Sequence, residues 1–260
     1  GWQLLKSSRF NVSRSGSEFV FRGGGFGHGL GLCQEGSHVM AQRGQSFQQI
    51  LAHYFPGTTV GQYRESAKPS LRSSHFRLVY PKTVDEREAE QVLSLLEANR
   101  SELLRRVSAA GIQPPFPDLE IVINETTGDF TGRTGMPSWA AAATKNNRVE
   151  LQPLKLLKQR RILETTLRHE LVHVLVDAVG NAQTPRWLTE GMAIYMAGEG
   201  KMIAQRQATS VEEVEHALAS AKSAGDMQTA YAGAYNLVRR LIQSDGEQKV
   251  WKRIADRSYS

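Results

Sequence analysis

The sequence predicts an α+β fold, in which a small mixed sheet precedes a mainly helical C-terminal half that carries a His-Glu-x-x-His helix. Three observations lead to this prediction. Short apolar runs with the length of strands lie between residues 76 and 152. A long amphipathic pattern with helical spacing lies between the first two of these runs. From about residue 160 onward the pattern is mainly helical, and strands followed by helices are typical of the α+β class.

The first segment, residues 1–62, contains short strands, a glycine-rich turn and helices. A strand-like run at 19–21 leads into six glycines within the nine positions that start at Gly23. So many glycines indicate a backbone that needs positive φ angles or a close approach to another group. Two helices are expected after the turn, over 34–42 and 46–54.

A polar stretch at 63–75, with Pro69 and several serines but no periodicity, is predicted to be a linker. The second domain is then expected over 76–260. Its predicted elements are strands at 76–80, 119–123 and 148–152 and a long helix at 83–109.

Composition and charge exclude some classes of protein. The 260 residues are enough for one large domain or two modest ones, and 40% hydrophobic with 22% charged residues is a globular balance. A net charge of +6 and a pI near 9.5 fit an ordinary basic protein, or attraction to an anionic polymer such as nucleic acid or a cell-wall matrix. No basic run is interleaved with aromatic residues, so no nucleic-acid partner is expected.

Cysteine usage and hydropathy leave the compartment open. Cys33 is the single cysteine, so no disulfide can form within the chain. No stretch approaches the roughly 18 apolar residues that a transmembrane helix needs, and no signal peptide is visible.

The strongest chemical signal is the run 166–176, which contains His169, Glu170 and His173. Two histidines four residues apart stand one turn apart on the same helix face, where their imidazoles can hold one zinc ion. Glu170 would contact a water on the metal rather than the metal itself. Such a water has a pKa lowered to roughly 7, so that a carboxylate can take its proton.

A bare His-Glu-x-x-His pattern also arises by chance on surface helices. Here the flanking residues argue against a chance occurrence. The helix is nearly apolar all round and is therefore expected to be buried. Buried without a shared partner, its three polar side chains would cost considerable free energy. The apolar flanks are Leu167, Leu171, Val172, Val174, Leu175 and Val176.

Glu190 is the candidate third ligand. It lies in a second predicted helix, from Trp187 to Met196, between apolar residues. It could instead be a solvated carboxylate or an ion-pair partner of Arg186. Two histidines, one glutamate and a water form an open zinc site of the catalytic type.

The run His169-Glu-Leu-Val-His173, followed by Pro185-Arg-Trp-Leu-Thr-Glu-Gly-Met-Ala-Ile-Tyr195, resembles the gluzincin metallopeptidases, in particular the peptidase MA-like group. The resemblance covers roughly residues 76–257 and implies a zincin-like domain, a bound Zn²⁺ and hydrolysis of peptide bonds. It implies that Glu190 is the third zinc ligand.

The same resemblance implies that Tyr231 assists the oxyanion, because a tyrosine that opens a later helix does so in the aminopeptidases. Tyr235 is the alternative, and Tyr231 could equally be a core aromatic residue. Residues 132–144 replace the Gly-x-Met-Glu-Asn type of strand that grips a free substrate amine in aminopeptidases. An endopeptidase, or an enzyme with another substrate, is therefore expected.

The first segment resembles the C-terminal part of the SpoIID/LytB family (stage II sporulation protein D and amidase enhancer) over about residues 17–60. The run from Phe21 to Gly36, with its Gly-His-Gly, and His53-Tyr-Phe-Pro-Gly-Thr58 carry the resemblance. It implies a link to peptidoglycan and an extracytoplasmic location, in the periplasm or cell envelope. The family's catalytic acid lies in an upstream region that these residues do not contain, so glycan cleavage is not assigned to them.

His28, Cys33 and His38 are spaced five residues apart and are residue types that suit a second metal site. Some members of the SpoIID family bind zinc in this neighbourhood. The alternative is that the glycine turn fixes His28 and that Cys33 is a small buried apolar residue.

Three functional interpretations remain open from the sequence. The leading one is an envelope-associated zinc peptidase that acts on a peptide or protein substrate and is linked to peptidoglycan. The second is a non-catalytic peptidoglycan-binding or scaffold protein. The third is part of a glycan-cleaving SpoIID-type enzyme in which zinc is structural.

Overall fold

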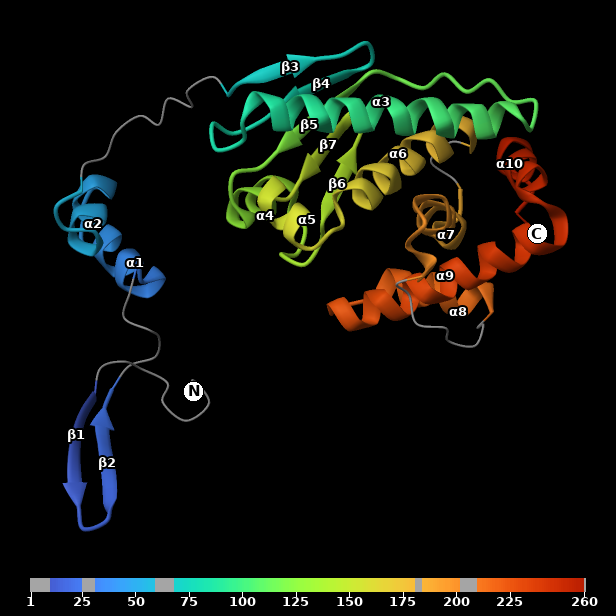
Figure 1. Cartoon of the computed structure of the whole chain (residues 1–260). Helices are drawn as coiled ribbons and strands as arrows, with labels where there is room; N and C mark the ends of the chain where they lie inside the picture. Colours follow the sequence, from blue (N-terminus) through green and yellow to red (C-terminus); the bar gives the residue numbers. More distant parts are fainter. Residues whose placement is uncertain (1–9, 25–30, 59–67, 181–183, 202–209, 260) are drawn as a thin grey trace. The chain divides into compact units, whose positions relative to one another are not determined.

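The computed structural model describes residues 10–24, 31–58, 68–180, 184–201 and 210–259. The chain divides into two compact units, Gly1–Glu65 and Ser66–Ser260. Figure 1 shows the elements of each unit in sequence colours. The mixture of helices and small sheets confirms the α+β prediction.

The first unit contains a hairpin and two short helices. Strands β1 (Phe10–Ser15) and β2 (Glu18–Gly23) pair antiparallel. The helices α1 (Gln34–Gln42) and α2 (Phe47–Tyr54) lie where the sequence predicted them. A Cβ atom added at Gly36 would lie 2.0 Å from the Tyr54 hydroxyl, so α1 and α2 pack closely at this glycine.

Apolar side chains of the first unit lie largely on its surface. None of its described residues is buried. The large exposed apolar residues in this unit are Val12, Phe19, Phe21, Leu32, Val39, Phe47 and Phe55. The described part of this unit therefore has no hydrophobic core of its own.

The second unit is built on a five-stranded sheet in the order β3-β4-β5-β7-β6. Strands β4, β5 and β7 run parallel, while the outer strands β3 and β6 each pair antiparallel with their neighbour. The sheet is mixed, as the sequence predicted. The strand bounds are β3 (Ser70–Arg72), β4 (Phe76–Val79), β5 (Leu119–Ile123), β6 (Ala142–Lys145) and β7 (Arg148–Leu151).

The two edge strands were not recognised in the sequence. Strand β3 occupies three residues of the range 63–75 that was expected to be a linker, and Leu71 packs against the core from it. Strand β6 has the sequence Ala-Ala-Thr-Lys, in which Thr144 is the one β-branched residue and none is aromatic, so the local pattern for a strand is weak. Both strands form because a neighbouring strand offers its backbone groups for pairing, which no local pattern reveals.

Helix α3 (Glu86–Ser108) connects the parallel strands β4 and β5 and contacts the sheet. Asp85 begins it by accepting a hydrogen bond from the backbone N–H of Glu88. One face is buried, through Ala89, Val92, Leu93, Leu96, Asn99, Leu103 and Val107. Two short helices, α4 (Thr127–Thr134) and α5 (Leu154–Gln159), were not predicted.

The C-terminal half is helical, as predicted from residue 160 onward. Helix α7 contacts both α6 and α9, and α10 contacts α9, α6 and α3 (Figure 1). The bounds are α6 (Leu163–Gly180), α7 (Arg186–Ala197), the 3₁₀ turn η1 (Glu199–Lys201), α8 (Val211–Ser220), α9 (Ala224–Asp245) and α10 (Glu247–Asp256).

Candidate metal centre

Helix α6 brings His169 and His173 to one face, one turn apart. Their ring centroids are 4.7 Å apart. The helix is buried along most of its length, as its apolar flanks predict, and the side chains of His169 and His173 are 11% and 19% exposed. The two imidazoles are thus largely withdrawn from water but not sealed from it.

Helix α7 places Glu190 opposite the two histidines. Its Oε2 lies 3.7 Å from Nε2 of His169 and 3.5 Å from Nε2 of His173. One ligand atom from each of the three residues lies within 4.8 Å of the others. The structure therefore brings together the three residues that the sequence proposed as metal ligands. No other cluster of three or more such residues occurs among the described residues.

The donor set fits a zinc ion. Oε2 of Glu190 is buried and has no hydrogen-bond partner among the described residues, which is costly for a carboxylate unless a cation is present. Two ligands at about 2.1 Å from a tetrahedral zinc lie about 3.4 Å apart. The two measured distances to Oε2, 3.5 and 3.7 Å, are close to this separation.

The electrostatics of the site also favour a cation. Burial alone lowers the pKa of His169, but the carboxylates of Glu190 and Glu199 outweigh burial and raise the pKa well above its usual value. Burial alone raises the pKa of Glu190, but His173 and His169 outweigh it and lower the pKa. The site holds negative charge that a proton or a metal ion can balance.

Several contacts fix α7, which carries Glu190. Glu215 of α8 accepts a hydrogen bond of 2.7 Å from the backbone N–H of Trp187 in the first turn. Gly191 lies so close to α9 that a Cβ atom there would be 2.5 Å from the Ala234 carbonyl oxygen. The position of Glu190 is therefore set by the packing of α7 against its neighbours.

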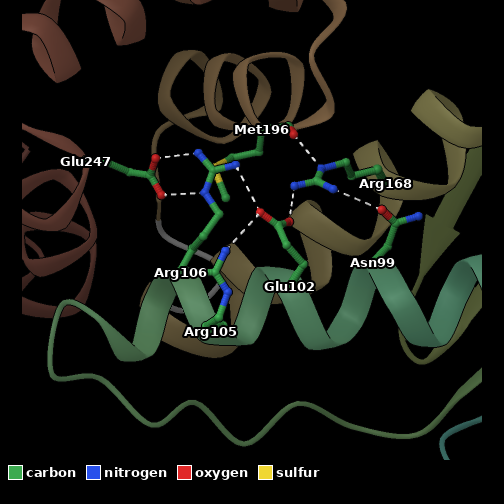
Figure 2. Close-up of polar contacts among 7 residues, drawn as sticks. All are labelled: Asn99, Glu102, Arg105, Arg106, Arg168, Met196 and Glu247. Atoms are coloured by element: carbon green, nitrogen blue, oxygen red, sulfur yellow. Dashed lines mark hydrogen bonds and ion pairs between the residues drawn. The ribbon is translucent and has the colours of Figure 1, made fainter.

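A polar network joins α6 to the other end of α7 (Figure 2). Arg168, which precedes His169, donates a hydrogen bond of 2.6 Å to the Met196 carbonyl and one of 3.0 Å to Oδ1 of Asn99 on α3. It also pairs with Glu102, which Arg106 approaches at 3.7 Å, and Arg106 pairs with Glu247 of α10. The network connects the two ligand-bearing helices to α3 and α10.

Strand β6 holds Glu170. The Thr144 hydroxyl donates a hydrogen bond to Oε2 of Glu170, and Glu170 is 9% exposed. Glu170 lines a cavity beside α6, and it is absent from the three-residue ligand cluster. This arrangement matches a residue that acts on a water or a substrate.

A cavity of about 460 Å³ lies beside the cluster, between β6 with its preceding loop, α6, η1 and α9. Its lining includes His169, Glu170, Glu199 and Tyr231 as well as the exposed apolar side chains Met136 and Trp139. Buried Gln152 holds this loop by donating hydrogen bonds to the carbonyls of Ser138 and Ala140. The cavity therefore borders the candidate centre on the side of His169 and Glu170.

Tyr231 lines this cavity, with its ring centroid 6.4 Å from that of His169. Burial, with the nearby negative charges of Glu190, Glu170 and Glu199, raises the pKa of Tyr231 far above its usual value, so its hydroxyl keeps its proton. Tyr231 lies inside α9, which begins at Ala224, and does not open the helix as expected.

Tyr235, the sequence-based alternative, stacks on Tyr195 and packs against Gly200. It therefore supports η1, while Tyr231 is the tyrosine that lines the cavity. Glu199 was missed by the sequence reasoning, although its Oε1 lies 3.2 Å from Nδ1 of His169. The sequence feature that could have pointed to Glu199 is its position between two glycines directly after an apolar helix.

The structure gives Cys33 and His38 separate partners. Sγ of Cys33 accepts a hydrogen bond of 3.4 Å from the backbone N–H of Gly36 and caps α1, and the Cys33 side chain is exposed rather than buried. His38 pairs with Gln42, one turn further along the helix. His28 lies outside the described residues. The second metal site stays a prediction.

Comparisons with known proteins bear on about a quarter of the chain. The amidase enhancer of Bacillus subtilis (strain 168) is 38% identical over 63 residues, which is 24% of this chain and 9% of that protein. The stage II sporulation protein D of Bacillus amyloliquefaciens is 36% identical over 58 residues, 22% of this chain and 17% of that protein. The chain contains a SpoIID-like region.

The stage II sporulation protein D of Bacillus subtilis (strain 168) is 34% identical over 58 residues. This chain spans 17% or less of the length of these three relatives. No family model matches the chain. Among the described residues, no helix is both long enough and apolar enough to cross a membrane.

Proposed function

We propose that this chain is a zinc-dependent metallopeptidase of the gluzincin type, acting in the cell envelope and linked to peptidoglycan by its SpoIID-like region. The observation that carries the proposal is the buried Oε2 of Glu190, which has no hydrogen-bond partner among the described residues and faces Nε2 of both His169 and His173. The similarity to an amidase enhancer and to stage II sporulation protein D supports the envelope part of the proposal.

His169, His173 and Glu190 would hold the metal. When bound there, zinc would act as a Lewis acid and lower the pKa of a coordinated water. Glu170, held by the Thr144 hydroxyl, would accept a proton from the attacking water and donate it to the leaving amine. The Tyr231 hydroxyl, which keeps its proton, would donate a hydrogen bond to the carbonyl oxygen as negative charge develops on it.

Strand β6 would bind the substrate backbone. It is one of the two edge strands of the sheet, and Thr144 from the same strand contacts Glu170. An edge strand offers unpaired backbone groups to which an extended peptide can add as a further strand. The apolar side chains of Met136 and Trp139 would then contact substrate side chains next to the cleaved bond.

The test is the zinc content of the full chain and its hydrolysis of a quenched-fluorophore peptide library and of purified peptidoglycan. Wild type should bind about one zinc per chain, and Glu190→Ala should lose it. Glu170→Gln should retain zinc and lose about 10²- to 10⁴-fold in hydrolysis rate, the usual contribution of a general base. Glu164→Gln changes an exposed carboxylate of the same helix and should resemble wild type.

Metal-replete wild type without zinc would overturn the proposal. So would a Glu170→Gln protein that hydrolyses substrates as fast as wild type. A zinc-loaded wild type that binds peptidoglycan but hydrolyses neither probe would favour the non-catalytic wall-binding interpretation. Release of glycan fragments from peptidoglycan lacking peptides would favour the glycan-cleaving one.

A further inference from the structure

We infer that Glu199 is a positioning residue of the metal centre, which fixes the orientation and proton position of the His169 imidazole. The inference rests on the proposed function. Oε1 of Glu199 lies 3.2 Å from Nδ1 of His169, within hydrogen-bonding distance, while Nε2 of the same ring faces Glu190 at 3.7 Å. The ring is therefore held between two carboxylates on opposite nitrogens.

The position of Glu199 follows from the backbone that carries it. Helix α7 ends at Ala197, and Gly198 takes a φ of 76°. This left-handed conformation suits glycine and turns the chain back out of the helix. The turn brings Glu199 over α6, one short segment beyond the helix that supplies Glu190.

The turn is fixed by its contact with α9. A Cβ atom at Gly200 would lie 2.1 to 2.4 Å from atoms of the Tyr235 ring, so the glycine backbone rests directly on this ring. Tyr235 in turn stacks on Tyr195 of α7, with ring centroids 6.4 Å apart and 29° between the planes. The Glu199 side chain is only 20% exposed, so it is not a freely rotating surface carboxylate.

This arrangement decides which nitrogen of His169 can bind a metal. A neutral imidazole carries one proton, and the nitrogen without it offers the lone pair. A carboxylate at Nδ1 keeps the proton there, which leaves Nε2 free and makes it more basic. Without Glu199, the proton could move to Nε2 and the ring could turn toward the cavity that it lines.

The inference predicts a graded loss of zinc affinity. Partners of this kind typically contribute 10- to 100-fold to metal affinity. We therefore expect Glu199→Ala to weaken zinc binding by about 10- to 100-fold. Glu199→Gln should fall between Glu199→Ala and wild type, because its amide oxygen still accepts the Nδ1 hydrogen but has no charge. Gly200→Ala, which displaces η1 from Tyr235, should weaken binding in the same direction.

The experiment is a competition between the 260-residue chain and a chromophoric chelator for zinc, with Glu164→Gln as the matched carboxylate control. Visible absorption of the Co²⁺-loaded proteins reports the geometry at the metal, and thermal unfolding of the metal-free proteins reports structural damage. We expect changed zinc affinity and a changed Co²⁺ spectrum in Glu199→Ala and Glu199→Gln, and neither change in the control.

Three outcomes would overturn the inference, and they can be told apart. If wild type binds zinc and both Glu199 variants bind it as tightly, Glu199 does not position the ring, although the proposed function stands. If wild type binds no zinc, the proposed function fails as well. A lowered unfolding temperature with unchanged zinc affinity and Co²⁺ spectrum would reduce Glu199 to a structural residue and also count against the inference.

Discussion

Replacement of Arg168 by methionine should destabilise the second unit, because Arg168 joins the two helices that carry the candidate ligands. The side chain is 19% exposed and donates to the Met196 carbonyl, to Oδ1 of Asn99 and to Glu102. Methionine would leave the first two acceptors without this donor. Each unsatisfied buried acceptor costs about 1–3 kcal/mol, so we expect a loss of about 2–6 kcal/mol in unfolding free energy for the two.

Glu102 adds little to this sum. It is 33% exposed and keeps Arg106 at 3.7 Å and Arg105 at 3.9 Å as partners after the substitution (Figure 2). The matched control is Arg105→Met, which removes a 75% exposed arginine from the same cluster. Exposed pairs contribute about 0–1 kcal/mol, so the control should stay close to wild type.

The assay is urea unfolding followed by tryptophan fluorescence. Three of the four tryptophans, at 139, 187 and 251, lie in the second unit, and Trp251 is fully buried. Arg168→Met should lower the midpoint without changing the slope of the transition. If Arg168→Met lost no more than Arg105→Met, the network would not hold α6 to α7 and the reasoning would be refuted.

Two further predictions follow from close contacts elsewhere in the second unit. Gly191→Ala should lower the free energy of unfolding by about 2 kcal/mol or more, since its Cβ would meet the Ala234 carbonyl oxygen at 2.5 Å. An unchanged or raised urea midpoint would contradict this. Burial alone raises the pKa of Glu97, but hydrogen bonds from Ser73 and His75 outweigh burial and lower the pKa. The stabilising contribution of Glu97 is therefore present at neutral pH and should be lost as pH falls through its lowered folded-state pKa. The difference in unfolding free energy between wild type and Glu97→Gln should shrink below about pH 4. An equal difference at pH 7 and pH 3 would contradict this assignment.

Local patterns were sufficient to predict some of the helices and strands. The apolar run at 119–123 is the buried strand β5, and the helix at 34–42 has the bounds that were expected. Edge strand β6 could not be predicted in this way, because Ala142 and Ala143 have little preference for a strand. Pairing with β7 and the contact with α6 place it there.

The residues of the candidate centre likewise include some that local spacing predicts and some that only the packing of helices places. Spacing alone put His169 and His173 on one helix face, because four residues make about one turn. Nothing local could show that Tyr231, rather than Tyr235, would line the cavity, since the two tyrosines lie one turn apart on the same face of α9 and only the packing of that helix decides which of them reaches the cavity.

The sequence by itself determined the two-histidine motif and its buried helix, because short-range periodicity fixes which side chains share a face. Glu190 was chosen from its apolar neighbours and from the resemblance to the gluzincins. Only the tertiary structure decided that Thr144 holds Glu170 and that Glu199 reaches His169. These contacts join residues 26 and 30 positions apart in the chain. The packing of separate elements determines both contacts, and local sequence patterns do not show which distant residues that packing brings together.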